Sequence, residues 1–310
     1  MSAVAVLFLS VSASRARQEA GQVVVSLSAV EKEGRPVEGL KAEDLRVTVE
    51  GQPQHVLSLS RRADEPLHVV IMLDASASQE RVLPFTQGAS DRLVPALLAR
   101  GAANDVAVVS FTGDVKVVQG LTADAASVRR ALASVEFEPP AGYIGGGVLV
   151  GTPRPNDPSG STAVWDALVE VCDKVFARAG AGRRVVLLVT DGVDTSSRLK
   201  PDKAVERLLR EGVAVYGVGI GDEQSFAGVD EASVRKVSER TGGRALFPKK
   251  NGELPAAFEQ VRRELLSSYA LTFAAPSVPP GKSLKLRVEL VNPELRKQGV
   301  QLAYPQALVR

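Results

Sequence analysis

The chain has 310 residues, of which 45% are hydrophobic and 24% are charged, and its formal net charge is +2. This is the composition of a globular protein with room for one large domain or two moderate ones. Aromatic residues make up only 5% of the chain, and no basic block carries interleaved aromatic residues, which argues against nucleic-acid binding. The single Cys172 excludes an internal disulfide, which fits either a reducing compartment or an exported protein.

The N-terminus begins with a short apolar stretch, SAVAVLFLSVSA, which is followed by Arg15 and Arg17. The stretch is too short to span a bilayer as a helix. It resembles the apolar region of a secretory signal peptide, which we place at residues 1–17. No Lys or Arg precedes it, and a disordered or strand-like N-terminus is the alternative. We expect an extracytoplasmic protein, periplasmic or secreted, without an integral membrane span.

Residues 22–62 predict a small β module. Residues 22–30 (QVVVSLSAV) are apolar and β-branched, residues 46–50 alternate in polarity, and residues 55–59 form a further candidate strand after a break at 51–53. A module of about 40 residues cannot bury a core alone. It therefore needs strands from elsewhere in the chain.

From Pro66 the pattern changes to apolar strands that alternate with helices. Strands are predicted at 67–73, 105–111, 184–189 and 214–220, with a hairpin strand at 115–119 and an edge strand at 244–247. Helices are predicted at 79–100, at 124–134 with Thr122 as N-cap, at 161–177 with Ser161 and Thr162 as caps, and at 201–211, 233–241 and 254–267. This alternation predicts an α/β fold with a doubly wound, mainly parallel sheet over residues 66–267. The proline- and glycine-rich segment 138–161 is predicted to be a long loop, and a loop of this length inside a compact domain is usually functional or mobile.

After residue 267 the pattern returns to β-structure. Strands are predicted at 269–274, 283–291 and 299–303. Because neither chain end has enough strands for a core of its own, we expect residues 268–308 to complete one small β-sandwich with residues 22–62. The α/β domain would then be an insertion in that sandwich.

Polar side chains stand where the predicted strands of the α/β domain end. Asp74, Ser76 and Ser78 follow the first buried strand, Thr162 precedes a helix, and Asp191 follows the strand at 184–189. The carboxyl ends of parallel strands share one edge of a sheet, so these residues can converge. Hydroxyl and carboxylate oxygens suit Mg²⁺ or Mn²⁺ better than zinc or copper. With only two carboxylates in the set, an open coordination position would attract an anionic group, most simply the Asp or Glu carboxylate of a partner protein.

These residues stand in motifs that resemble the von Willebrand factor type A domain and its metal-ion-dependent adhesion site (MIDAS). The Asp-x-Ser-x-Ser motif is at 74–78, the threonine loop at 160–167 (GSTAVWDA), and the Thr-Asp-Gly motif at 190–192. The resemblance implies a Rossmann-like fold and a non-enzymatic adhesion or protein-binding function with bound Mg²⁺, or else Mn²⁺ or Ca²⁺. Ala75 and Ala77 depart from the more usual Thr and Gly.

The resemblance also implies how the five candidate ligands divide their roles. Ser76, Ser78 and Thr162 would bind the metal directly, and Asp74 and Asp191 would act mainly through water. Short motifs outside this set resemble a bacterial subgroup, often called the acidobacterial type, that is predicted to be exported. They are at 37–40 (VEGL), 43–45 (EDL), 49–52 (VEGQ), 241–243 (TGG) and 268–271 (SYAL).

Other polar residues near the motifs have ordinary structural interpretations. We expect Asp194, Thr195 and Ser197 to belong to a solvated loop and N-cap, Asp166 to stabilise the first turn of its own helix, and Cys172 to be a core residue.

Catalytic alternatives have little support in the sequence. A Ser-His-Asp hydrolase needs a histidine base, but His55 lies in the β module and His68 in the buried strand. An aspartyl phosphotransferase would favour a carboxylate where Ser76 stands, and no G-x-x-x-x-G-K-[ST] motif is present. The remaining alternative to an adhesion module is a structural or assembly subunit of an envelope complex, in which the metal site serves an internal contact. A metal-dependent hydrolase ranks below both.

Overall fold

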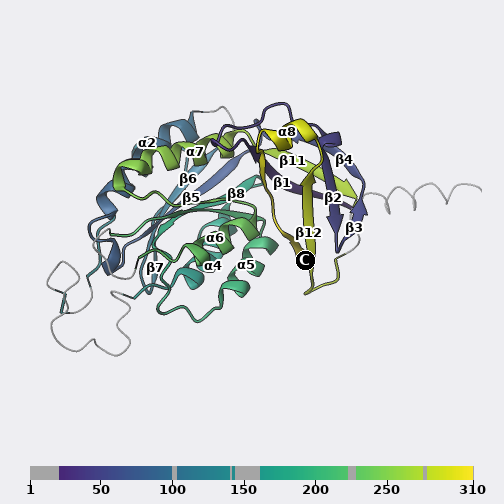
Figure 1. Cartoon of the computed structure of the whole chain (residues 1–310). Helices are drawn as coiled ribbons and strands as arrows, with labels where there is room; N and C mark the ends of the chain where they lie inside the picture. Colours follow the sequence, from purple (N-terminus) through teal and green to yellow (C-terminus); the bar gives the residue numbers. More distant parts are fainter. Residues whose placement is uncertain are drawn as a thin grey trace, which may run out of the picture.

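The computed structural model describes residues 21–99, 103–139, 142–143, 161–222, 228–274 and 278–309. Its larger part is a six-stranded sheet in the order β10-β9-β8-β5-β6-β7 (Figure 1). All neighbours in this sheet are parallel except β6 and β7, which form an antiparallel hairpin at one edge. The strands are β5 (Leu67–Asp74), β6 (Asp105–Phe111), β7 (Val115–Thr122), β8 (Arg183–Thr190), β9 (Val213–Gly219) and β10 (Ala245–Leu246).

Six helices cover the two faces of the sheet. They are α2 (Leu83–Leu98), α3 (Ala125–Ala133), α4 (Val164–Lys174), α5 (Pro201–Arg210), α6 (Glu231–Thr241) and α7 (Leu254–Leu266). All eight residues of β5 are buried. Because successive side chains of a strand point to opposite faces, Val69 and Ile71 join a core with α2, α3 and α7, whereas Val70 and Met72 join a core with α4, α5 and α6. The predicted α/β class with a mainly parallel sheet is therefore confirmed.

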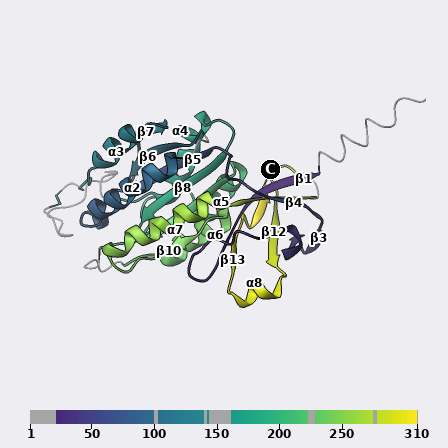
Figure 2. The same ribbon diagram turned by 90° about the horizontal axis from the view of Figure 1, so that it is seen from above.

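Strands from both chain ends form a β-sandwich beside the α/β unit (Figure 2). One sheet has the order β13-β1-β11-β4 and the other β14-β12-β2-β3. The strands are β1 (Gln22–Val30), β2 (Leu45–Val49), β3 (Gln52–Gln54), β4 (Val56–Arg61), β11 (Tyr269–Ala274), β12 (Ser283–Leu290), β13 (Gln301–Ala303) and β14 (Ala307–Val309). A third core, which includes Leu27, Val47, Leu271 and Leu286, fills the space between these sheets. The chain ends thus complete one another, as the sequence predicts.

The pairing of β1 with β11 shows why neither chain end is sufficient alone. Gln22 to Leu27 pair antiparallel with Ala274 to Tyr269, and β2 pairs with β12 in the same way. Each of these contacts joins residues more than 200 positions apart. The exact domain limits, 22–62, 66–267 and 268–308, stay a prediction.

Several predicted element ends are wrong. The helix predicted from residue 79 begins at Leu83, because a 3-10 turn, Ala77–Gln79, comes first. Thr122 is the last residue of β7, so the N-cap of α3 is Asp124, whose carboxylate accepts the amides of Ala126 and Ser127.

Two short elements and one hairpin strand were not predicted. Residues 52–54, which overlap the break predicted at 51–53, form β3, which pairs with β2. The helix α8 (Pro293–Lys297) has Asn292 as its N-cap, and β14 closes an edge of the second sheet. Elements of three to five residues give too few periods for a pattern to show.

Within the described ranges, no helix is both long and apolar enough to cross a membrane. The predicted signal peptide at 1–17 and most of the predicted loop at 138–161 lie outside the described residues.

Candidate metal centre

Asp74 is the last residue of β5 and is buried. Its Oδ1 accepts the amide of Ser76 at 3.0 Å, and its Oδ2 accepts the hydroxyl of Thr190, the last residue of β8, at 2.6 Å. β5 and β8 are parallel neighbours, so both strands end at the same edge. The carboxylate is therefore fixed from two adjacent strands.

The two serines of the motif follow β5, with Ser76 as the N-cap of the 3-10 turn and Ser78 within the turn. Ser76 is buried and Ser78 is half-buried, and their Oγ atoms are 3.2 Å apart. The Ser76 hydroxyl hydrogen-bonds to the carboxylate of Asp74, and the Ser78 hydroxyl hydrogen-bonds to the carboxylate of Asp191. The two serines therefore lie between the two carboxylates.

Asp191 is buried one residue beyond the end of β8. Its Oδ1 accepts the amide of Val193 at 3.0 Å, and hydrogen bonds from Ser78 and Gln79 also act on its carboxylate. Direct interactions therefore connect Asp74, Ser76, Ser78 and Asp191 into one cluster.

Thr162 is buried just before α4. Its amide donates to Thr195 Oγ1 at 2.8 Å, its carbonyl accepts the amide of Thr195 at 2.8 Å, and the amide of Ala163 donates to the carbonyl of Thr112 at 2.9 Å. Thr195 belongs to the loop that continues from Asp191. Thr162 is thus held at the same edge by the chain that carries Asp191.

The helix α4 is capped by that loop and not by Ser161 and Thr162, as we expected from the sequence. It begins at Val164, and the amides of Trp165 and Asp166 donate to Ser197 Oγ at 3.0 and 3.2 Å. A cap that comes from a residue about thirty positions downstream leaves no local sequence pattern.

Asp166 and Asp194 connect α4 to the loop after β8. Asp166 lies in the first turn of α4, as predicted, and its carboxylate also accepts the amides of Arg198 and Leu199 in that loop at 3.0 and 2.9 Å. Asp194 Oδ2 accepts the Ser197 hydroxyl at 2.5 Å, which orients the cap. We name residues 194–199 the strap, because these contacts tie the loop after β8 to α4.

Gln79 is a further residue that the sequence reasoning missed. It is buried, and its Nε2 donates to the carbonyl of Ile220 at 3.2 Å. A polar side chain directly after the Asp-x-Ser-x-Ser motif was the available signal, but a glutamine there has no distinctive pattern.

The charges of the cluster fit a cation. Burial, and next the negative charge of Asp191, raises the pKa of Asp74, and hydrogen bonds from Ser76 and Thr190 offset part of this. Burial also raises the pKa of Asp191. Two buried carboxylates beside three hydroxyl-bearing residues make an oxygen-only donor set, which suits a hard divalent cation. In the described segments no group of three or more His, Cys, Asp and Glu side chains is placed to hold a metal.

Comparisons with known proteins agree with the fold that carries this cluster. The model of the von Willebrand factor type A domain matches residues 154–260. A solved von Willebrand factor type A structure from Catenulispora acidiphila aligns over 93% of this chain and 74% of its own, with a TM-score of 0.51 and 14% sequence identity. The chain contains a von Willebrand factor type A domain. The matched residues of this type A domain include Thr162 and Asp191, whereas Asp74, Ser76 and Ser78 precede them and join the site through the fold.

A second similar fold is proximal thread matrix protein 1 from the mussel byssus. It aligns over 67% of this chain and 50% of its own, with a TM-score of 0.52 and 19% identity. This chain thus spans about half the length of the mussel protein. Another structure of that protein, described as having a zinc-occupied MIDAS motif, aligns over 67% and 50% of the two chains, with a TM-score of 0.51 and 18% identity. No curated protein matches the chain. The acidobacterial subgroup stays a prediction.

Proposed function

We propose that the chain is a non-enzymatic, metal-dependent protein-binding module. A divalent cation, Mg²⁺ in the first place, would be held by Asp74, Ser76, Ser78, Thr162 and Asp191 and would bind the Asp or Glu carboxylate of a partner protein. The observation that carries the proposal is the convergence of two buried carboxylates and three hydroxyl-bearing residues at the carboxyl edge of the sheet.

The residues of the chain set the charge of the site. In the proposed arrangement Ser76, Ser78 and Thr162 contact the cation through neutral hydroxyls, and the two aspartates act mainly through water. Neutral direct ligands leave the cation strongly electrophilic, and an anionic partner group then completes its coordination. The bond from Thr190 to Asp74 and the bond from Val193 to Asp191 keep both carboxylates oriented.

The wider setting of this function is also a proposal. The zinc-occupied MIDAS of the mussel protein supports metal binding by this fold, although it does not indicate which ion this chain prefers. The extracytoplasmic location rests on the signal-like sequence of residues 1–17.

The metal site is tested by thermal unfolding of the wild type and Asp74→Asn, with EDTA and with Mg²⁺ or Mn²⁺. In EDTA the variant should be more stable, on the order of 2 kcal/mol, because one of two uncompensated buried charges is removed. With metal at a hundred times its Kd the wild type should gain about 2.7 kcal/mol, and the variant should gain little. The order of stability should therefore reverse on adding metal.

Asp91→Asn is the matched control, since Asp91 forms an exposed pair with Arg129 away from the site. It should respond to metal as the wild type does. Equal metal-induced stabilisation of wild type and Asp74→Asn would refute the assigned site. Partner binding is then measured by capture from an envelope extract, and capture that persists both in EDTA and with Asp74→Asn would refute a metal-bridged contact.

A further inference from the structure

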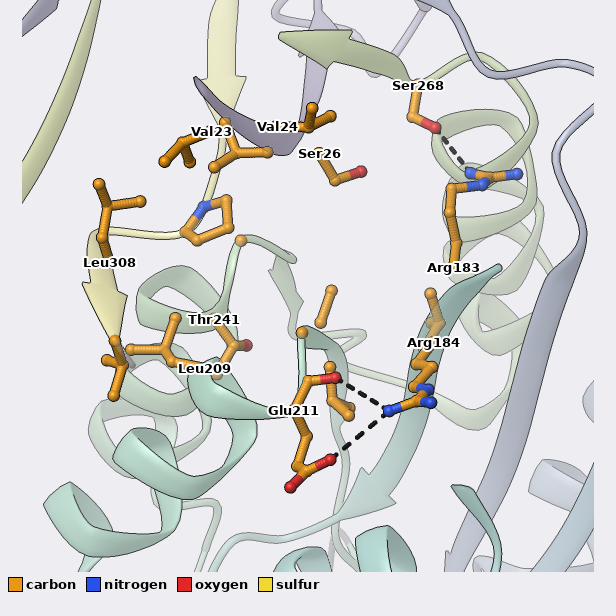
Figure 3. A pocket seen from close by; sticks show the side chains of 18 of the residues that line it. Val23, Val24, Ser26, Arg183, Arg184, Leu209, Glu211, Thr241, Ser268 and Leu308 are labelled. Atoms are coloured by element: carbon orange, nitrogen blue, oxygen red, sulfur yellow. Dashed lines mark hydrogen bonds and ion pairs between the residues drawn. The ribbon is translucent and has the colours of Figure 1, made fainter. Parts of the chain in front are cut away.

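A second site is suggested by a cavity of about 580 Å³ between the β-sandwich and the α/β unit (Figure 3). It is lined at the amino end of β8 by Arg183 and Arg184, whereas the candidate metal centre lies at the carboxyl end of the same strand. Eight residues of strand separate the two ends by about 23 Å. The cavity is therefore distinct from the metal centre.

One wall of the cavity is the edge of strand β1. Four consecutive residues, 23–26, line it. Successive side chains of a strand point to opposite faces, so a cavity that contacts four in a row lies along the strand edge and not over one face. β11 pairs with the other edge of β1 along Gln22–Leu27. Among the residues that the structure describes, the cavity edge of β1 is paired only by β13, at Ser28–Val30.

A second wall is formed by strand β14 of the opposite sheet. Its three residues Ala307, Leu308 and Val309 all line the cavity, and β14 pairs with β12 at Ser283–Lys285. The chain leaves β13 after Ala303 and crosses to β14 in the other sheet within three residues. This crossover leaves the sandwich open between β1 and β14, and we name the opening the strand gap.

The remaining wall is charged. Of the lining side chains that carry charge, three are arginines, Arg62, Arg183 and Arg184, and one is Glu211. Arg62 is paired with Glu65, and Arg184 Nη1 lies 3.5 Å from Glu211 Oε2. Arg183 Nη1 donates to two neutral groups, the carbonyl of Leu265 at 2.7 Å and Ser268 Oγ at 2.6 Å. Figure 3 shows Arg183 and Arg184 across the hollow from the β1 residues Val23, Val24 and Ser26. With Glu65 and Glu211 each paired to one of the three arginines, this wall has an excess of positive charge, which favours an anionic occupant.

We propose that the strand gap binds an extended segment of a partner protein that adds to the edge of β1 and carries an acidic side chain. A free strand edge presents backbone donors and acceptors in a row, which is how sheets accept an added strand. Val23 and Leu308 contact the apolar side chains of the segment, and the Arg183–Arg184 wall receives its carboxylate. Backbone pairing supplies the affinity and the arginine wall selects the charge.

The test measures the binding of fluorescent synthetic peptides to the full chain by anisotropy. The probe is acetyl-TVEVTVEV-amide, which alternates apolar and polar residues. Its comparison peptides are acetyl-TVKVTVKV-amide, with reversed charge, and the acidic peptide with alternate amides N-methylated. The acidic peptide should bind at least tenfold more tightly than either, because one comparison lacks the charge match and the other lacks backbone donors.

Variants of the chain locate the binding. Ser26→Trp fills the strand gap and should reduce the affinity more than tenfold, whereas Ser58→Trp, the same change at an exposed position of β4, should leave it unchanged. Arg184→Gln should reduce the preference for the acidic over the basic peptide. Circular dichroism and thermal melting check that each variant remains folded.

Chelation separates this proposal from the metal-dependent function. Peptide binding in the strand gap should be equal in EDTA and in Mg²⁺, so failure of the metal site does not affect it. The proposal is overturned if the acidic peptide shows no binding at millimolar concentration, if N-methylation has no effect, or if Ser26→Trp binds as Ser58→Trp does. Two further results would overturn the proposal. If removal of residues 1–20 raises peptide affinity tenfold, the strand gap binds the chain's own N-terminal segment. If the chain self-associates and Ser26→Trp abolishes the association, the strand gap binds a second copy of the chain.

Discussion

Burial is the main influence on the chemistry of Cys172. This residue is on the buried face of α4, and its Sγ is 3.7 Å from the carbonyl of Leu168. Burial, and to a lesser extent the charge of Glu211, raises the pKa of this thiol to about 11. The predicted core role of Cys172 therefore agrees with its surroundings.

A raised thiol pKa leads to a prediction about pH. The folded state favours the neutral thiol, so its contribution to stability is complete below the unfolded pKa of about 8.5 and is lost as pH rises toward 11. We expect the free energy of unfolding to fall over this window in the wild type and less in Cys172→Ala. In the folded protein at pH 8, a thiol reagent should not react, whereas in urea it should react fully. Rapid labelling of the folded chain would contradict the burial of this thiol.

The five candidate ligands could be proposed from the sequence because each stands in a motif at a strand or helix end. The side chains that support them could not. Ser197 of the strap accepts an amide of α4, and Asp166 of α4 accepts an amide of the strap. A contact between elements about thirty residues apart leaves no local pattern. Gln79 was missed for a related reason, since its partner, the carbonyl of Ile220, lies in a different loop.

At the scale of elements, the strap couples the position of Thr162 to that of Asp191. Ser197→Ala removes the hydroxyl that accepts the amides of Trp165 and Asp166, so it should cost about 1 kcal/mol in urea unfolding. It should also weaken metal binding, because the chain segment next to Thr162 loses its anchor. Ser196→Ala is the matched control, since Ser196 contacts Thr162 through its backbone amide. Equal metal affinity in both variants would show that the strap does not position the site.

Elements with strong periodicity were predictable, and short or non-local ones were not. β5 is apolar throughout because it is buried between two helical layers, and that pattern predicts a central parallel strand. By contrast β14 has only three residues and was not predicted. β13, also of three residues, falls within the strand predicted at 299–303, but its pairing with β1 at the other end of the chain leaves no local pattern. The strand gap could not be predicted from the sequence either, because it depends on where the chain crosses from one sheet to the other.

At the scale of the whole molecule, a buried ion pair joins the two units. Glu264 of α7 is almost fully buried and lies 2.9 Å from Arg244 Nε. Ser28 of β1 donates to Glu264 at 3.4 Å, and Arg244 Nη1 donates to Gln301 of β13 at 2.9 Å. Both charged residues belong to the α/β unit, and both neutral partners belong to the sandwich.

Loss of one member of this pair should be costly. Glu264→Ala leaves Arg244 without its buried counter-charge, so we expect unfolding to become about 3–5 kcal/mol easier. Glu259→Ala on the same helix removes an exposed pair with Arg262 and should cost about 1 kcal/mol or less. Chemical denaturation of both variants measures the difference. Equal costs would show that Glu264 does not hold the units together.

The way the α/β unit is attached also determines how the molecule carries mechanical load. The chain enters the unit after β4 and leaves it after α7, and these two connections lie side by side, with the amide of Arg62 donating to the carbonyl of Ser268 at 3.0 Å. A pull applied at the metal edge therefore passes down the parallel strands and leaves through two neighbouring covalent links into β4 and β11, which are paired antiparallel. Because the two links share the tension and neither strand has to separate from the other, a load on the edge that carries the candidate metal centre reaches the sandwich without opening the parallel sheet.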